Sequence, residues 1–266
     1  MKETVPLEKL ISLRGKTAIV TGAAAGIGRA IAARFGEAGA NLELVDKDLK
    51  GLESLKQELS KMDLNINLYQ FDMSVRENIT ILWQKWQEHP PDILVNNVGI
   101  YPPQDFLAFE HSVWQKVMDT NLNSTQHMCR YMLKARGKKG GVIINLGSIE
   151  AILPFADDLI HYDVSKAGII ALTRGLAKEF GKKGFKINAI LPGGIDTPGT
   201  QAVATRILTK FDIGLIPSGI KYLSRIPSAR RGHPDEVARI ALFLACDLSS
   251  YVQGTLIPAD GGFLSS

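Results

Sequence analysis

A glycine-rich turn between an apolar run and a helical segment is the clearest chemical feature of the sequence. Gly22, Gly26, Ile27 and Gly28 lie in this turn, directly after the apolar and β-branched residues 17–20. Gly22 can make a tight turn, and Gly28 lets a helix pack closely against a strand. The N–H groups at the start of that helix, and its dipole, would face a phosphate group. The sequence therefore predicts a dinucleotide site with the pyrophosphate at this turn.

An acidic residue stands where the next apolar run ends. Asp46 follows residues 42–45, and a carboxylate at this place can accept hydrogen bonds from both ribose hydroxyls of an adenosine. The same carboxylate would repel a 2′-phosphate group. We therefore expect NAD as the cofactor. The basic Lys47 next to Asp46 leaves NADP open as the less favoured alternative.

Short apolar runs alternate with longer segments of helical periodicity, and this order would position both features. Such alternation is typical of βαβ units with a parallel sheet. We expect an α/β chain with a doubly wound Rossmann fold, in which seven parallel strands are flanked by helices on both faces. The strands are expected at 17–20, 42–45, 66–69, 93–95, 142–144, 186–190 and 255–257, and the helices near 27–38, 48–62, 75–88, 111–136, 161–181 and 234–246.

The organisation of the chain favours one domain over residues 1–266, because no Pro-, Gly- or Ser-rich linker and no internal repeat divides it. The alternation is interrupted at about 193–231, which is rich in proline and glycine. An irregular segment of that length in a compact fold is typical of a binding loop. We expect it to form the substrate loop.

Further motifs follow the glycine turn in a fixed order. They are Asn96-Asn97-Val98-Gly99, the helical Asn121, Ser148 after the fifth expected strand, the Tyr-x-x-x-Lys pair Tyr162 and Lys166, and Pro192-Gly193. Each motif alone is common, but in this order they make the chain resemble the short-chain dehydrogenase/reductase family. The resemblance covers almost the whole chain and departs at Val98, where the family has alanine.

The resemblance implies an oxidoreductase that transfers a hydride between a nicotinamide cofactor and a secondary alcohol or ketone. Tyr162 would act as the acid/base on the hydroxyl proton. Because a tyrosine is normally protonated at neutral pH, its pKa has to fall, and Lys166 places an ammonium one helical turn away on the same face. Ser148, at the carboxyl end of its strand, would hold the substrate oxygen. Asn121 would keep a water in a proton relay to Lys166, which would also bind the ribose.

The same resemblance implies further contacts with the cofactor. Asp72 would contact the adenine, Asn97 and Gly99 would flank the adenosine ribose, and Ile195 and Thr197 would hold the nicotinamide amide. The full predicted cofactor-binding set is Gly22, Gly26, Ile27, Gly28, Asp46, Asp72, Met73, Asn97, Gly99, Tyr162, Lys166, Pro192, Ile195 and Thr197.

Glu150 is the most informative residue about the substrate. A carboxylate two residues after Ser148 can accept hydrogen bonds from hydroxyl groups and disfavours an anionic substrate. Together with Ser148 and Tyr162 it makes up the predicted substrate-binding set. We expect a neutral polyol, sugar or hydroxyketone, while an outward-facing or salt-bridged Glu150 stays open as an alternative. Residues 100–103 and the 193–231 loop would form further walls.

Two other functions compete with this interpretation. A 3-oxoacyl-[acyl-carrier-protein] reductase could use the lysine pairs at 138–139 and 182–183 to meet an acidic carrier protein. Asp46 disfavours it, because those reductases mostly take NADPH. A non-catalytic dinucleotide-binding sensor would be expected to lack Tyr162 or Lys166, and both are present.

The composition and charge of the chain limit the classes of binding partner to be expected. Hydrophobic residues make up 45% of the chain, and the net charge of +4 comes from basic residues interspersed with acids, so we expect a small-molecule substrate and no nucleic-acid partner. No apolar run approaches the roughly 18 residues of a membrane span. The two cysteines fit buried thiols of a cytoplasmic protein, and the family resemblance suggests a homotetramer.

Two neighbouring features are expected to have no catalytic role. His161 precedes Tyr162, but adjacent helical residues point about 100° apart, so we expect a partly exposed histidine. Asp157, Asp158 and Asp163 lack a second group at ligand spacing, and no metal site is expected.

Overall fold

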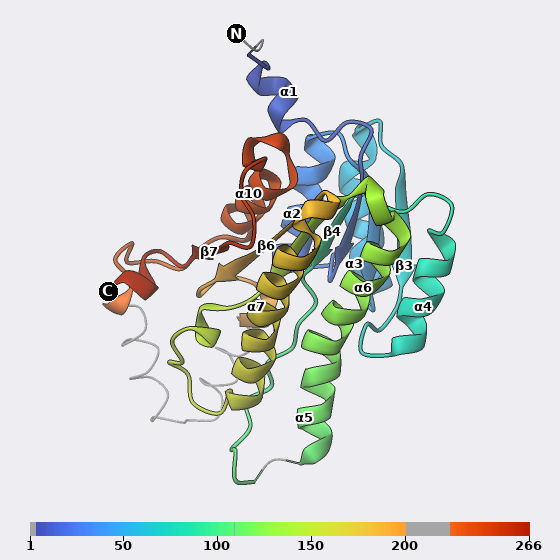
Figure 1. Cartoon of the computed structure of the whole chain (residues 1–266). Helices are drawn as coiled ribbons and strands as arrows, with labels where there is room; N and C mark the ends of the chain where they lie inside the picture. Colours follow the sequence, from blue (N-terminus) through green and yellow to red (C-terminus); the bar gives the residue numbers. More distant parts are fainter. Residues whose placement is uncertain (1–3, 109, 201–223) are drawn as a thin grey trace.

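The computed structural model describes residues 4–108, 110–200 and 224–266 (Figure 1). Of the expected substrate loop at 193–231, residues 201–223 lie outside the described part of the chain. Within the described ranges, no helix is long and apolar enough to cross a membrane.

A seven-stranded parallel sheet runs through the described part, as the sequence predicts. Its order is β3-β2-β1-β4-β5-β6-β7, so the chain first builds outward from β1 and then returns to the other side of it. Carboxyl ends of parallel strands meet at one edge, and the reversal between β1 and β4 opens a crevice there. The strands are β1 (Thr17–Thr21), β2 (Asn41–Asp46), β3 (Ile66–Gln70), β4 (Ile93–Asn96), β5 (Gly141–Leu146), β6 (Phe185–Pro192) and β7 (Leu256–Ala259).

Helices cover both faces of this sheet (Figure 1). The α-helices are α1 (Leu7–Ile11), α2 (Gly26–Glu37), α3 (Leu49–Glu58), α4 (Arg76–Lys85), α5 (His111–Met118), α6 (Ser124–Arg136), α7 (Ile160–Phe180) and α10 (Pro234–Ala245). A π-helical turn η2 (Asp119–Asn123) joins α5 to α6. The short 3-10 helices are η1 (Leu59–Lys61), η3 (Gly137–Lys139), η4 (Ile149–Ala151), η5 (Gly181–Lys183), η6 (Asp247–Ser249) and η7 (Phe263–Ser265).

The central strands β1, β2, β4, β5 and β6 are largely buried on both faces, which explains their continuous apolar runs, while the edge strands β3 and β7 are partly exposed. Successive side chains of a strand point to opposite faces. Ala18 and Val20 of β1 therefore join the core cluster under α2, α3 and α10, while Ile19 joins the cluster under α4, α6 and α7. The two clusters fix the register of β1 and hence the place where its chain turns into α2.

Two details differ from the expected elements. The helix expected at 111–136 is divided by η2, because residues 119–123 widen into a π turn. The helix α1 was not expected. The first turn of α10 follows the prediction, since Pro234 opens the helix and His233 and Glu236 cap each other reciprocally.

Candidate active site

The glycine turn connects β1 to α2 at the carboxyl edge of the sheet. Gly22 and Gly26 have φ values of 68° and 56°, a region that favours glycine. Gly28 packs so closely that a Cβ atom there would overlap the Gly22 carbonyl oxygen. Asn97 Nδ2 donates to the Thr21 carbonyl at 3.0 Å and to that of Gly22 at 3.2 Å. The turn is therefore held from the next strand of the sheet.

This geometry fits a dinucleotide pyrophosphate. Helix α2 begins at Gly26, and no side chain caps its start at Ala25. Gly22, Gly26 and Ile27 line a cavity of about 830 Å³, so the uncapped N–H groups of the first turn lie beside open space.

Asp46 lies at the end of β2 and lines the same cavity, as does Lys47. One Asp46 oxygen accepts from the Ala24 N–H at 3.0 Å, and the other accepts from the Asp48 N–H at 3.0 Å. These two bonds fix the carboxylate beside the glycine turn, at the place where an adenosine ribose would reach it.

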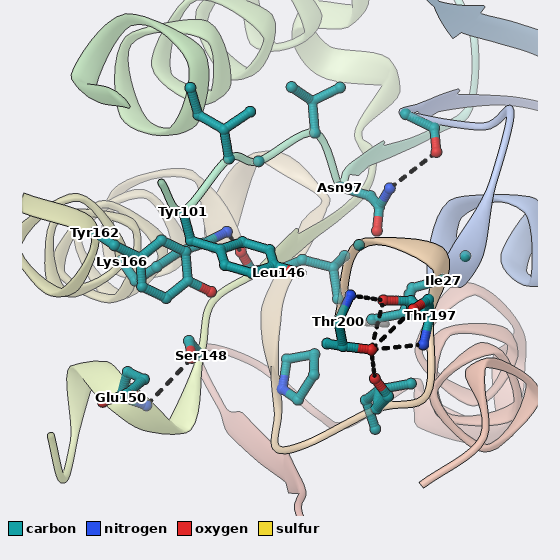
Figure 2. Close-up of a pocket in the computed structure, with 18 of the residues that line it drawn as sticks. Ile27, Asn97, Tyr101, Leu146, Ser148, Glu150, Tyr162, Lys166, Thr197 and Thr200 are labelled. Carbon is teal, nitrogen blue, oxygen red and sulfur yellow. Dashed lines mark hydrogen bonds between the residues drawn. The ribbon is translucent and has the colours of Figure 1, made fainter. Parts of the chain in front are cut away.

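The side chains of Ser148, Tyr162 and Lys166 gather in the cavity from two elements (Figure 2). Ser148 follows β5, and its Oγ accepts from the Glu150 N–H at 3.2 Å. Tyr162 and Lys166 lie one turn apart on α7. Lys166 is only 4% exposed, and its Nζ donates to the Leu146 carbonyl at 2.8 Å. This bond holds the Lys166 ammonium at the carboxyl end of β5.

The electrostatics of Tyr162 differ from the expectation. Burial raises the pKa of the phenol, the Ser148 hydroxyl opposes this, and the charge of Glu150 adds to the rise. The lowered pKa that we predicted for Tyr162 is therefore wrong for the chain by itself. The physical reason is burial of the phenol. The expected opposing charge, Lys166 Nζ, lies 5.7 Å from the ring centroid and is turned to Leu146. Burial also lowers the pKa of Lys166 to about 8.

Asn121 lies behind the cavity wall, in the π turn η2. Its Oδ1 accepts from the Ile100 N–H at 2.8 Å, and its Nδ2 donates to the Ile100 carbonyl at 2.9 Å and to Ser165 Oγ at 3.0 Å. The amide thus holds the segment after β4 against α7.

Glu150 lines the cavity next to Ser148 and is 4% exposed, so it is neither turned outward nor free in water. One carboxylate oxygen accepts from the Phe155 N–H at 2.9 Å. Burial raises the pKa of Glu150 to about 7, although the bond from Phe155 opposes that rise and the charge of Asp163 adds to it.

The structure brings nearly all predicted site residues to one cavity. Gly28 and Asn121 stand behind its walls. The residues on its walls are Gly22, Gly26, Ile27, Asp46, Asp72, Met73, Asn97, Gly99, Ser148, Glu150, Tyr162, Lys166, Pro192, Ile195 and Thr197.

Among the polar residues that line the cavity, sequence reasoning did not single out Tyr101, Lys116, Thr120 and Thr200. Thr200 Oγ1 donates to the Ile195 carbonyl at 2.9 Å and accepts from the Thr197 N–H at 2.9 Å, which closes a tight turn around the expected nicotinamide residues (Figure 2). The Thr-x-x-Thr spacing could have indicated such a turn. Tyr101 lies in the predicted wall 100–103, but no motif singled it out.

His161 corrects another expectation. It is 1% exposed, and its Nε2 lies 2.8 Å from the Pro102 carbonyl oxygen, so the expected partly exposed histidine is wrong. The loop 100–103 folds over the start of α7 and covers it. In the part of the chain that the structure describes, no group of three or more His, Cys, Asp or Glu side chains is placed to hold a metal ion.

Comparisons with known proteins agree with this fold. Residues 22–264 match the family model described as enoyl-(acyl carrier protein) reductase. The chain is 35% identical over 266 residues to 2-dehydro-3-deoxy-D-gluconate 5-dehydrogenase of Bacillus subtilis, covering 97% of this chain and 98% of that protein. It is 34% identical over 258 residues to the 3-oxoacyl-[acyl-carrier-protein] reductase FabG of Thermotoga maritima, covering 95% and 99%.

A solved structure is similar over nearly the whole length. The L-sorbose reductase of Gluconobacter frateurii, complexed with NADPH and L-sorbose, superimposes with a TM-score of 0.87 at 28% identity and covers 97% of this chain and 99% of that one. The chain therefore belongs to the short-chain dehydrogenase/reductase family. It is an oxidoreductase that acts on a secondary alcohol or ketone with a nicotinamide dinucleotide.

Proposed function

We propose that this chain is an NAD(H)-dependent dehydrogenase/reductase of a neutral polyol, sugar or hydroxyketone, with Tyr162 as its acid/base. The observation that carries the proposal is the common cavity of Ser148, Tyr162 and Lys166 with the glycine turn and Asp46. One cavity can bring a dinucleotide and a small substrate to the same phenol.

In the proposed mechanism, Ser148 holds the substrate oxygen and Tyr162 exchanges the proton with it. When bound, the nicotinamide ring accepts or supplies the hydride, and its positive charge in the oxidised form favours the Tyr162 phenolate. The buried Lys166 ammonium, 5.7 Å from the ring centroid, adds to that field and can bind the ribose. Asn121 keeps the wall at Ile100 fixed and takes part in the proton relay.

The preference for NAD is supported by the fixed Asp46 carboxylate. It would set this chain apart from the L-sorbose reductase, whose structure holds NADPH. We expect the wild type to turn over NADH faster than NADPH. The variant Asp46→Ala should lose about 10- to 150-fold in kcat/KM for NADH and little for NADPH, since a ribose hydrogen bond to a charged group contributes about 1.5–3 kcal/mol. Asp63→Ala, at an exposed carboxylate, is the control. Equal or better rates with NADPH in the wild type would contradict the proposal.

The preference for a neutral substrate is supported by carboxylates at the cavity. Glu150, Asp157 and Asp158 all line it, and they follow Ser148 closely in the sequence. The cationic groups among the described lining residues are Lys47, Lys116, Lys166 and Arg231. A panel of polyols, neutral sugars and sugar acids tests this with the wild type and Glu150→Ala. We expect neutral compounds to be preferred, and the variant to lose that preference. The same order of rates in both proteins would mean that Glu150 does not select the substrate.

The acyl-carrier-protein reductase remains the second candidate because FabG enzymes are close in sequence. The lysine pairs that could attract an acidic carrier protein do not lie near the cavity. The lysine pairs 138–139 and 182–183 lie in η3 and η5, which precede the amino ends of β5 and β6. The cavity opens at the carboxyl ends, so these pairs would meet a carrier protein on the wrong side.

We also propose a cytoplasmic, single-domain chain that assembles as a homotetramer. Helices α5, α6 and α7 run along one face (Figure 1), and α7 exposes Ile160 and Val164. Burying such apolar side chains favours association through this face. Sedimentation should give about four times the chain mass of 29.0 kDa, and a monomer would contradict the assembly.

A further inference from the structure

The backbone around Tyr101 is held by two other elements. Asn121 of η2 binds both the N–H and the carbonyl of Ile100, at 2.8 and 2.9 Å. His161 of α7 lies 2.8 Å from the Pro102 carbonyl oxygen. Both neighbours of Tyr101 are therefore anchored, and its side chain has a fixed origin at the cavity wall.

The Tyr101 side chain contacts two parts of the site that lie on different elements (Figure 2). Its ring packs edge-on against the Tyr162 ring, with 5.7 Å between centroids and an interplanar angle of 62°. Its hydroxyl reaches the turn after β6, where a Cβ atom added to Gly199 would come within 2.8 Å of it. Burial raises the pKa of the Tyr101 phenol, and the nearby Thr197 side chain opposes that rise.

We propose that Tyr101 is a positioning residue that spaces the Tyr162 phenol from the 197–199 turn and so sets the width of the cavity where nicotinamide and substrate meet. The inference rests on the proposed roles of Tyr162 in catalysis and Thr197 in cofactor binding. Because its backbone is anchored, the Tyr101 ring cannot be pushed from the Gly199 side without pressing on Tyr162. A displacement of about 1 Å in a catalytic group can reduce the rate up to about 100-fold.

A double-mutant cycle tests this contact. Gly199→Ala adds a methyl group that has to displace the Tyr101 hydroxyl, whereas Tyr101→Phe removes that oxygen and keeps the ring. The φ of Gly199 lies outside the left-handed region, so alanine itself is not strained there. We expect Gly199→Ala to weaken NADH binding, measured by nicotinamide fluorescence, by about tenfold in the wild type. In the Tyr101→Phe background the same substitution should cost less than about threefold.

The control for adding a methyl group is Gly175→Ala in α7, where nothing lies within 4 Å of the added atom. The control for removing a hydroxyl is Tyr251→Phe at a fully exposed tyrosine. Both should bind NADH as the wild type does. An equal effect of Gly199→Ala in the two backgrounds, or no effect in either, would overturn the proposal.

Turnover gives a second readout, with D-fructose and hydroxyacetone as the probes and NADH as the reductant. Tyr101→Ala should lower kcat about 10- to 100-fold for the smaller ketone and less for the larger one, because the widened cavity suits a larger substrate. Tyr101→Phe should keep kcat for both ketones within about threefold, since the ring remains. A parallel loss for both ketones in Tyr101→Ala would contradict a spacing role. If the wild type reduces neither ketone, the proposed substrate class fails, but the NADH binding cycle still decides on Tyr101.

Discussion

The buried carboxyl of Glu150 makes the stability of this protein depend on pH in a direction that can be measured without any substrate. Burial raises its pKa from 4.5 to about 7, against the opposing hydrogen bond from the Phe155 N–H. In the unfolded chain the carboxyl ionises near its ordinary value. The native state therefore holds the proton over a pH range in which the unfolded state has released it.

The sign follows from this difference. Between pH 4.5 and 7 the native state binds more protons, so the free energy of unfolding falls as the pH rises and levels off above about pH 7. The full change in pKa from 4.5 to about 7 corresponds to about 3 kcal/mol. Screening by water in the cavity reduces the effect at pH 8 to about 2 kcal/mol. At pH 5 it stays well under about 1 kcal/mol, because the unfolded carboxyl is still partly protonated there.

Glu150→Gln removes the ionisation and can still accept the hydrogen bond from Phe155. Urea unfolding followed by circular dichroism, at one protein concentration, should show the variant gaining about 1.5 kcal/mol over the wild type between pH 5 and pH 8. Glu53→Gln, at an exposed position of α3, should show the same difference from the wild type at both pH values. The reasoning would be refuted if Glu150→Gln gained no stability relative to the wild type between pH 5 and pH 8, or lost stability relative to it.

Three further outcomes follow from the packing and the site. Gly28→Ala forces a methyl group into the Gly22 carbonyl and should lower the Tm by about 5–10 °C, while an unchanged Tm in thermal denaturation would show that the turn is not tightly packed. Arg136→Ala loses bonds to the Pro90 and Pro91 carbonyls and should cost about 2–3 kcal/mol in urea unfolding, against little for the exposed Arg239→Ala; equal costs would contradict this. Lys166→Met should lower kcat at least about 100-fold in steady-state assays, and normal turnover would exclude a role in activating the phenol.

Much of the fold could be predicted because a parallel sheet buried on both faces leaves a strong pattern. The apolar runs predicted all seven strands within the described residues, with ends that differ by at most two residues. The positions of the motifs also predicted that residues far apart in the sequence lie close together. Asp46 and Ser148 stand at the carboxyl ends of two parallel strands, and these ends share one edge of the sheet. The helical period alone was enough to predict that Tyr162 and Lys166 lie on the same face of one helix.

The remaining features depend on tertiary contacts that leave no local pattern. The π turn at 119–123 is a single turn between two ordinary helices, so periodicity alone does not separate it from α5 and α6. His161 is buried only because the loop 100–103 folds over it. The raised pKa of Tyr162 comes mainly from burial, which depends on the segments that pack around the phenol. The Leu146 carbonyl that holds the Lys166 ammonium comes from β5, far from α7 in the sequence.

The role of Tyr162 is tested most directly by Tyr162→Phe, with NADH binding and NADH-linked turnover measured on the same preparation. A phenyl ring keeps the packing against Tyr101 but has no proton to exchange. We predict that NADH binds within about twofold of the wild type, while kcat falls at least about 100-fold for every polyol, sugar or ketone that the wild type accepts. Undiminished turnover with intact NADH binding would contradict Tyr162 as the acid/base.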